Sequence, residues 1–180
     1  NITLSRHPIV ENEVIKFPKS TNLAIASDIK IGSRMVRIYN CHLESYSISF
    51  TSIIKKISKR DTFQEEFNYV HERLRDANLK RSEQVKTVLE SEEASCCPTI
   101  VCGDFNDMPL SYTYHKLTSS KKDSFVEAGE GFSATYSVLW PLLRIDYILI
   151  PGEYNADKHM VKRIPYSDHY PVTTNIYFEQ

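Results

Sequence analysis

The segment of residues 99–109 places the strongest constraint on the fold. An apolar run within it ends at Gly103, and this pattern predicts a buried strand that stops at a turn. Asp104 and Asn106 follow at once, and residues two apart in an extended chain point to the same side. Their carboxylate and amide can therefore reach one ligand together. The alternative is an Asx turn, in which both side chains only satisfy backbone groups of the loop.

Two later segments also combine apolar strands with chemically active side chains. Asp146 stands near the start of the apolar run that ends at Ile150, and Asp168 and His169 directly precede another apolar stretch. A carboxylate inside a strand needs a partner, because an unpaired buried charge is costly. This recurring arrangement favours one shared site over three unrelated turns.

An earlier pair of segments predicts a β-hairpin. Residues 22–31 and 35–43 alternate between polar and apolar side chains, and Gly32 supplies a turn between them. In the second strand, alternation places Asn40 and His42 on one face, at the end of an apolar row. A single histidine at such a place is more often a structural residue.

Taken in chain order, these segments resemble the endonuclease/exonuclease/phosphatase superfamily of metal-dependent phosphoesterases. Because His42 falls within one of the family's motifs, the resemblance favours a functional role for this histidine over a structural one. The matching segments are Asn40-Cys41-His42-Leu43, Gly103-Asp104-Phe105-Asn106, Arg144-Ile145-Asp146-Tyr147 and Ser167-Asp168-His169-Tyr170-Pro171-Val172. Four ordered matches are far more specific than one.

The resemblance implies a fold and a domain boundary. It covers Leu4 to about Phe178, beginning with a segment that looks like an earlier family hairpin, and Gly129-x-Gly131 before Thr135-Tyr136 is similar to a bacterial subgroup of metal-dependent hydrolases. The implied fold is α+β, a two-sheet β-sandwich flanked by helices in four layers. Residues 1–180 would form one domain that lacks the family's N-terminal strands, which carry an Asn and a metal-binding Glu. Without that Glu, we expect residues 1–180 alone to bind metal weakly and to be inactive.

The resemblance also assigns roles to the central residues. Asp104 would position and deprotonate the attacking water, while Asn106 would hydrogen-bond the phosphate or its metal. His169 would contact the phosphoryl group or act as a base, and Asp146 would accept its other ring N–H. His42 would contact phosphate or donate a proton to the leaving group.

Three further residues receive roles from the same resemblance. Asp168 would be a metal ligand, together with the Glu that is missing upstream of residue 1. Asn40 would contact substrate, and Arg144 would either contact substrate or form a structural salt bridge. Oxygen-rich ligands without cysteine spacing favour Mg²⁺ or Mn²⁺ over zinc. Six of these side chains are expected to converge in one cleft, because each ends a strand whose apolar neighbours enter the same core: Asp104, Asn106, Asp146, Asp168, His169 and His42.

The function implied is Mg²⁺-dependent hydrolysis of phosphoester or phosphodiester bonds by attack of water. The superfamily's site serves nucleic acids, inositol phosphates and phospholipid head groups, because specificity lies in the surrounding loops. One alternative is a head-group phosphatase or phosphodiesterase at a membrane, and another is a binding module that kept the fold and lost the chemistry. Relatives often carry N-terminal membrane helices, so a membrane tether in the parent protein is a further expectation.

A small basic amphipathic segment bears on the membrane alternative. Such a segment can lie on anionic lipid or flank a phosphate-bearing substrate. More often, a pattern of this kind is the solvent-exposed face of a helix. Its cations are Lys55, Lys56, Lys59 and Arg60, interleaved with isoleucines.

Composition excludes some classes of protein. A length of 180 residues with 41 % hydrophobic content suits one domain with a real core, and a formal charge of −1 disfavours a binder that relies on bulk attraction to phosphate backbones. The Arg-and-aromatic surface of a single-strand nuclease is not evident. The four cysteines lack zinc-site spacing and are expected to be reduced thiols.

The remaining pattern is helical or mixed. Residues 47–93 carry helical periodicity, with a break expected near residues 59–62, and Arg81 and Gln84 are expected to bridge to a neighbouring loop. Ser111 is predicted to cap a short helix that ends at Leu117. Later strands are expected at residues 145–150, 160–164 and 171–178.

Overall fold

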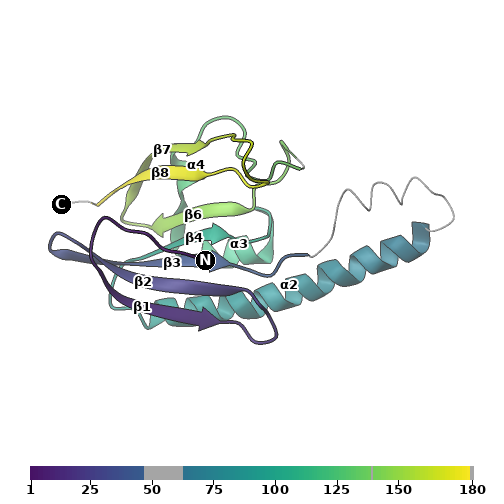
Figure 1. The fold of residues 1–180 in the computed structure, drawn as a ribbon, viewed down its shortest axis with the longest axis horizontal. Coiled ribbons are helices and arrows are strands. Elements are labelled where there is room, and N and C mark those ends of the chain that lie inside the picture. Colours follow the sequence, from purple (N-terminus) through teal and green to yellow (C-terminus); the bar gives the residue numbers. More distant parts are fainter. Residues whose placement is uncertain (47–62, 139, 179–180) are drawn as a thin grey trace.

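The architecture is a six-stranded sheet with two of the described helices on one face and a two-stranded sheet on the other, and a third, short helix packs against the two-stranded sheet (Figure 1). A computed structural model describes residues 1–46, 63–138 and 140–178. The large sheet has the order β1-β2-β3-β4-β6-β5, and β7 pairs with β8 in the second sheet. The strands are β1 (Ile9–Lys16), β2 (Leu23–Ile31), β3 (Arg34–His42), β4 (Thr99–Asp104), β5 (Lys121–Asp123), β6 (Asp146–Pro151), β7 (Asn155–Val161) and β8 (Val172–Tyr177). The helices are α2 (Phe63–Glu93), α3 (Tyr112–Leu117) and α4 (Ser124–Ala128).

The pairing of β3, β4 and β6 brings distant segments together at one edge. β3 and β4 run parallel, and His42 lies opposite Asp104 in their register. β4 and β6 run antiparallel, and Asp104 lies opposite Asp146. The ends of three strands therefore place His42, Asp104 and Asp146 side by side.

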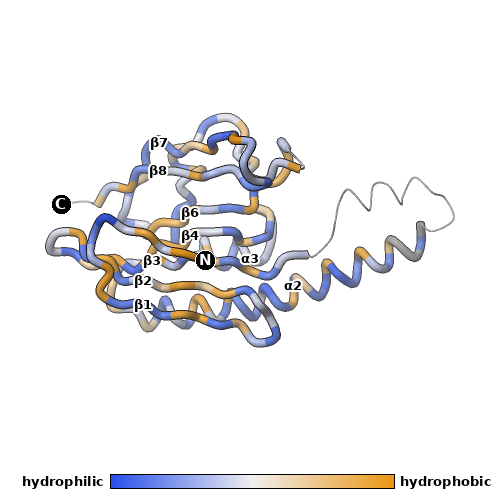
Figure 2. The backbone as a smooth tube through the Cα atoms, viewed as in Figure 1, coloured by the Kyte–Doolittle hydropathy of each residue, from blue (hydrophilic) through white to orange (hydrophobic). Residues whose placement is uncertain are grey.

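The main core lies between the large sheet and the helices. Its buried side chains come from one face of the strands and from the C-terminal half of α2, whereas the N-terminal half of α2 extends past the sheet (Figure 1). β1 and β2 carry hydrophobic residues along much of their length (Figure 2). Burial of the apolar side chains of this core stabilises the fold by roughly 25 cal/mol for each Å² of apolar surface removed from water. Core members include Tyr39, Cys41, Val85, Val88, Val101, Tyr147 and Leu149.

The opposite face of the large sheet borders an apolar cleft of about 590 Å³. Ile38, Ile100 and Ile148 line it from the large sheet, and Ile176 lines it from β8. Asp146 and His169 also border this cleft, so the space between the two sheets opens beside the acidic edge.

Most of the predicted organisation is confirmed. The two-sheet α+β sandwich is present, the hairpin of β2 and β3 turns at Gly32 with φ +63°, and the Ser111 side chain caps α3. Cys41 and Cys102 lie in β3 and β4, and all four cysteines are free thiols. The basic segment of residues 55–60 lies outside the described residues, so its surface role stays a prediction.

The prediction for residues 160–164 was wrong in its bounds. β7 spans Asn155–Val161 and contains a register shift between Asp157 and Met160. Lys158 adopts φ +54° at this bulge, and polar residues precede it. An irregular polar strand lacks the apolar alternation on which the prediction depended. Among the described helices, none is long and apolar enough to cross a bilayer.

Gly103 provides a test of the strand packing. It adopts φ +127°, and a Cβ built there would lie 2.0 Å from the carbonyl oxygen of Cys41 on the neighbouring strand. Gly103→Ala should therefore lower the free energy of unfolding by more than about 3 kcal/mol, because backbone must separate from backbone. Urea denaturation measures this change.

Gly152→Ala is the matched control, since no atom lies within 4 Å of its added Cβ. Its free energy of unfolding should change by less than about 0.5 kcal/mol. Equal stability of the two variants would contradict the close approach at Gly103.

Candidate active site

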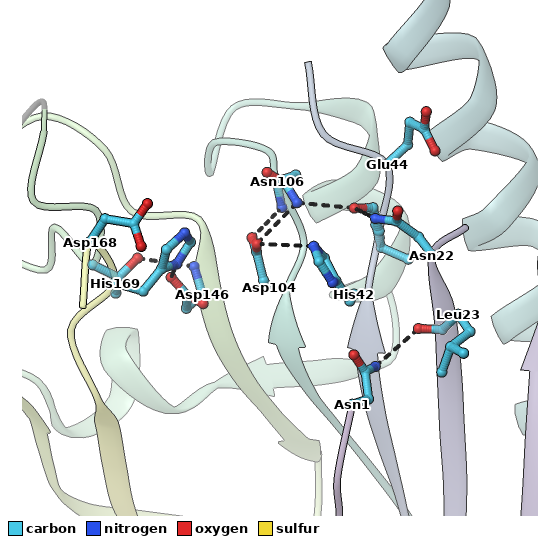
Figure 3. A network of polar contacts seen from close by, with 12 residues as sticks. Asn1, Asn22, Leu23, His42, Glu44, Asp104, Asn106, Asp146, Asp168 and His169 are labelled. Atoms are coloured by element: carbon cyan, nitrogen blue, oxygen red, sulfur yellow. Dashed lines mark hydrogen bonds and ion pairs between the residues drawn. The ribbon is translucent and has the colours of Figure 1, made fainter. Parts of the chain in front are cut away.

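The turn after β4 fixes Asp104 through its own loop. The Asn106 backbone N–H donates to Asp104 Oδ1 at 2.8 Å, and Asn106 Nδ2 donates to Asp104 Oδ2 at 3.0 Å (Figure 3). Asn106 adopts φ +51°, which asparagine tolerates well. The Asx turn is thus real, and it orients the Asp104 carboxylate toward the edge shared with β3 and β6.

The same turn distinguishes between the two predicted partners of Asn106, the phosphate and its metal. Its Nδ2 also donates to the carbonyl oxygen of Leu43 at 3.0 Å, so both amide protons are engaged. A phosphate oxygen needs a donor, whereas the remaining amide Oδ1 is an acceptor. In this geometry Asn106 is suited to a metal rather than to the predicted hydrogen bond with phosphate.

Across the edge, Asp146 and His169 form the expected dyad. His169 Nδ1 lies 2.9 Å from Asp146 Oδ2 (Figure 3). Thr135 Oγ1 accepts the backbone N–H of Asp146 at 3.1 Å, and the Tyr136 ring stands edge-on to the His169 ring with centroids 5.2 Å apart. The dyad therefore has support from the segment before β6. The pair Thr135-Tyr136 had been noted in the sequence, without a role.

Electrostatics distinguish the three central groups. Burial, followed by the charge of Asp146, raises the pKa of Asp104 to about 6. The hydrogen bond with Asp146 raises the pKa of His169, while burial lowers the pKa of His42. His42 Nε2 stands 3.7 Å from Asp104 Oδ2, so the neutral imidazole lies beside a carboxylate that titrates near neutrality.

The donor set fits a divalent cation. One ligand atom each from Asp104, Asp146 and His169 lies within 4.8 Å of the other two. Two carboxylates held this close repel one another, and this repulsion adds to burial, the larger cause, in raising the pKa of Asp104. A cation between them would relieve it, and mainly oxygen ligands suit Mg²⁺ or Mn²⁺.

The other predicted residues lie apart from this three-residue cluster. The Asp168 side chain is exposed beside His169 (Figure 3), and its role as a metal ligand stays a prediction. Asn40 donates from Nδ2 to the carbonyl oxygen of Ile2 at 2.9 Å, and its contact with substrate also stays a prediction. Of the six side chains predicted to meet, five do so at one edge, and for Asp168 the convergence stays a prediction; the five are His42, Asp104, Asn106, Asp146 and His169.

Arg144 requires a correction. Its side chain is buried, and Nη1 donates to Asp123 Oδ2 at 2.6 Å. The guanidinium also packs over the rings of Tyr114, Phe125 and Tyr147 at 5.7, 4.9 and 4.7 Å from their centroids. A cation enclosed in this way has no surface to offer a substrate, so the structural salt bridge is the correct alternative.

Comparison with protein families agrees with this geometry. The model of the Endonuclease/Exonuclease/phosphatase family matches residues 1–169. The chain belongs to this family. Comparison with curated protein sequences gave no match.

Solved structures share the fold of this family member. A functionally unknown conserved protein from Enterococcus faecalis V583 is 16 % identical, with a TM-score of 0.70 over 96 % of this chain and 67 % of its own. A mannosyl-6-phosphatase from Bacteroides thetaiotaomicron is 16 % identical, with a TM-score of 0.66 over 95 % and 67 %. The catalytic domain of human nocturnin with a bound sulfate anion is 21 % identical, with a TM-score of 0.63 over 97 % and 61 %. The chain thus spans about two-thirds of their length.

Helix α2 supports the site from behind. Arg81 is fully buried and donates from Nε to Asp107 Oδ2 at 3.1 Å and from Nη1 to the carbonyl oxygen of Glu44 at 2.8 Å. Gln84 Oε1 accepts the backbone N–H of Glu44 at 2.8 Å. These bonds hold the chain just after His42 against the turn after β4. The predicted bridge from Arg81 and Gln84 to a neighbouring loop is confirmed.

Removing the buried guanidinium should destabilise the protein. Arg81→Met leaves the Asp107 carboxylate buried without its cation, so the free energy of unfolding should fall by about 3 kcal/mol. Lys86→Met is the control, since Lys86 forms only an exposed pair with Glu90. Thermal or urea denaturation compares the two, and a similar small effect from both would contradict the support role of Arg81.

The dyad predicts a shift in a histidine titration. Asp146→Asn removes the hydrogen bond that raises the pKa of His169, so this pKa should fall toward or below its ordinary value near 6.5. NMR titration without added divalent metal measures it. His159, which is bonded to Ser124 instead, should keep its own titration.

The sign for stability follows from the same shift. A raised pKa means that the folded state favours protonated His169, so the dyad's contribution is complete below about pH 6.5 and declines as pH rises through the raised pKa. Asp146→Asn should therefore cost more stability at pH 5.5 than at pH 8.5. An unchanged His169 pKa in the variant would contradict the dyad.

Proposed function

We propose that the site hydrolyses phosphoester bonds with Mg²⁺ or Mn²⁺ and water as the nucleophile. The observation that carries this proposal is the acidic edge of the sheet, where Asp104 faces the Asp146–His169 dyad. Ligand atoms of these three residues lie within 4.8 Å of one another, close enough to surround one metal ion. Family membership gives the reaction class of phosphoester hydrolysis. The metal and the phosphodiester preference are our proposal.

The cation would be held by the carboxylates of Asp104 and Asp146, with Asn106 Oδ1 and Asp168 close to the same edge. When bound, it would offset negative charge on the phosphoryl oxygens. The family's glutamate, expected from outside residues 1–180, would add a further carboxylate to the three-residue cluster. That contribution stays a prediction.

Asp104 is the group best placed to activate water. A general base must be held within reach of the water, and Asp104 lies at the strand end between His42 and the Asp146–His169 dyad. The two hydrogen bonds from Asn106 hold its carboxylate in one orientation. The proton taken from water can therefore reside on Asp104 after attack on phosphorus.

Two imidazoles would serve the phosphoryl group. Asp146 accepts the Nδ1–H of His169, which leaves Nε2 to face the substrate and stabilises the protonated ring. His42 is kept neutral by burial, so its N–H can donate to a phosphoryl or leaving oxygen. This division of roles supports an enzyme over an inactive module, because a binding protein has no need of a paired base and acid.

The first test measures metal binding separately from turnover. Added Mn²⁺ should broaden the NMR signals of His169 and Asp146, and Asp104→Asn should weaken that binding because it removes one of two carboxylates. In a chain that also carries the family's glutamate, Asp104→Asn should lower Mg²⁺-dependent hydrolysis of bis(p-nitrophenyl) phosphate about 100-fold or more.

Asp76→Asn is the control, since Asp76 is an exposed carboxylate on α2. It should change neither readout. Broadening away from the edge of β4 and β6, or hydrolysis that survives in Asp104→Asn, would contradict the assignment.

A further inference from the structure

An exposed aromatic and cationic surface lies beyond the cluster described above. The Arg163 guanidinium stacks on the Trp140 ring at 3.6 Å from its centroid, and the Phe132 ring meets Trp140 edge-on at 5.8 Å. Phe132 is 70 % exposed and Trp140 is 37 % exposed. We name Phe132, Trp140 and Arg163 the aromatic–arginine surface. Exposed aromatic rings that pack against one another and against an arginine commonly mark a binding surface.

The charge on this surface points to an anionic ligand. Arg163 is exposed and, within the described residues, has no carboxylate partner. It lines a cavity of about 990 Å³ together with Phe132 and Lys162. Three basic side chains, Lys158, Lys162 and Arg163, face two carboxylates, Glu130 and Asp157, around this cavity. The balance is positive although the whole chain is close to neutral.

Backbone bonds tie the surface to the active site. Trp140 N–H donates to the carbonyl oxygen of Ser137 at 3.3 Å, and Ser137 N–H donates to that of Asp168 at 2.8 Å. Lys162 N–H donates to the carbonyl oxygen of Pro171 at 3.0 Å. Both segments are thus fastened to the stretch that carries His169. In Figure 1 the loop before β6 and the loop after β7 lie together at one end of the sandwich.

We infer that the aromatic–arginine surface binds nucleotides next to the cleaved phosphodiester of a single-stranded nucleic acid. This inference rests on the proposed phosphoesterase function. Bases of a single strand stack on exposed aromatic rings, and an arginine next to them contacts the phosphate. The exposed ring of Phe132 can stack on a base. Stacking on the Trp140 ring holds the Arg163 guanidinium in place to bind a phosphate. Duplex bases are not free to stack in this way.

Other phosphate esters match the surface less completely. A lipid head group would use Arg163 and Lys162 but not the ring of Phe132. An unsubstituted sugar would stack on the ring but would not need the cations. A single-stranded oligonucleotide uses both kinds of group, and it is therefore the ligand class that the surface fits.

Trp140 supplies a direct readout, because it is the only tryptophan in the chain. Binding of a twelve-residue oligothymidylate, with EDTA present to prevent hydrolysis, should quench Trp140 fluorescence in a saturable way. Arg163→Glu and Phe132→Ala should each raise the Kd about tenfold or more. The Kd should also rise with salt, because phosphate contacts release counterions.

Lys86→Glu is the control for charge reversal, since Lys86 lies on α2 and should leave the Kd unchanged. A duplex of the same length should bind more weakly than the single strand. Absence of quenching, equal effects of Arg163→Glu and Lys86→Glu, or tighter binding of anionic lipid vesicles than of oligothymidylate would overturn the inference.

The experiments can reject the nucleic-acid surface and the phosphoesterase activity independently of each other. Hydrolysis of bis(p-nitrophenyl) phosphate by the chain that also carries the family's glutamate, without oligothymidylate binding, would reject the nucleic-acid surface alone. Specific oligothymidylate binding by that chain without any metal-dependent hydrolysis would reject the proposed catalysis and leave a single-strand binding protein.

Discussion

The register of β3, β4 and β6 is the constraint on which the site depends. It sets His42 opposite Asp104 and Asp104 opposite Asp146, so three reactive side chains become neighbours through backbone hydrogen bonds alone. A slip of one residue in either pairing would turn a side chain to the other face of the sheet. Gly103 protects this register, because only a residue without Cβ allows β3 and β4 to approach so closely at that point.

The sequence predicted the parts of the site that follow regular strands. His42 and Asp104 end strands and Asp146 begins one, all with clear apolar patterns, and the resemblance gave His169 its partner. Elsewhere the sequence left two roles open, and tertiary contacts decide between them. Arg144 precedes a strand like a site residue, yet Asp123, far away in the chain, encloses it. Asn106 has the right amide, but Leu43 takes the proton that a phosphate would need.

The aromatic–arginine surface shows the same limit. Phe132 and Trp140 stand in an irregular segment, and Arg163 follows a strand whose bulge hides its periodicity. No spacing in the sequence relates the three residues, because they meet only through backbone bonds to the stretch around His169. The sequence alone gave no sign of this surface.

The parallel pairing of β3 with β4 has a consequence for folding. These strands are joined through the long connection that contains α2, and pairings between distant segments form slowly because the entropy of closing the chain must be lost first. His42 and Asp104 thus become neighbours only after the crossover has closed. A chain that has formed its local hairpin and helices would still lack a metal site, and a cation would bind only to the finished fold and stabilise it by mass action.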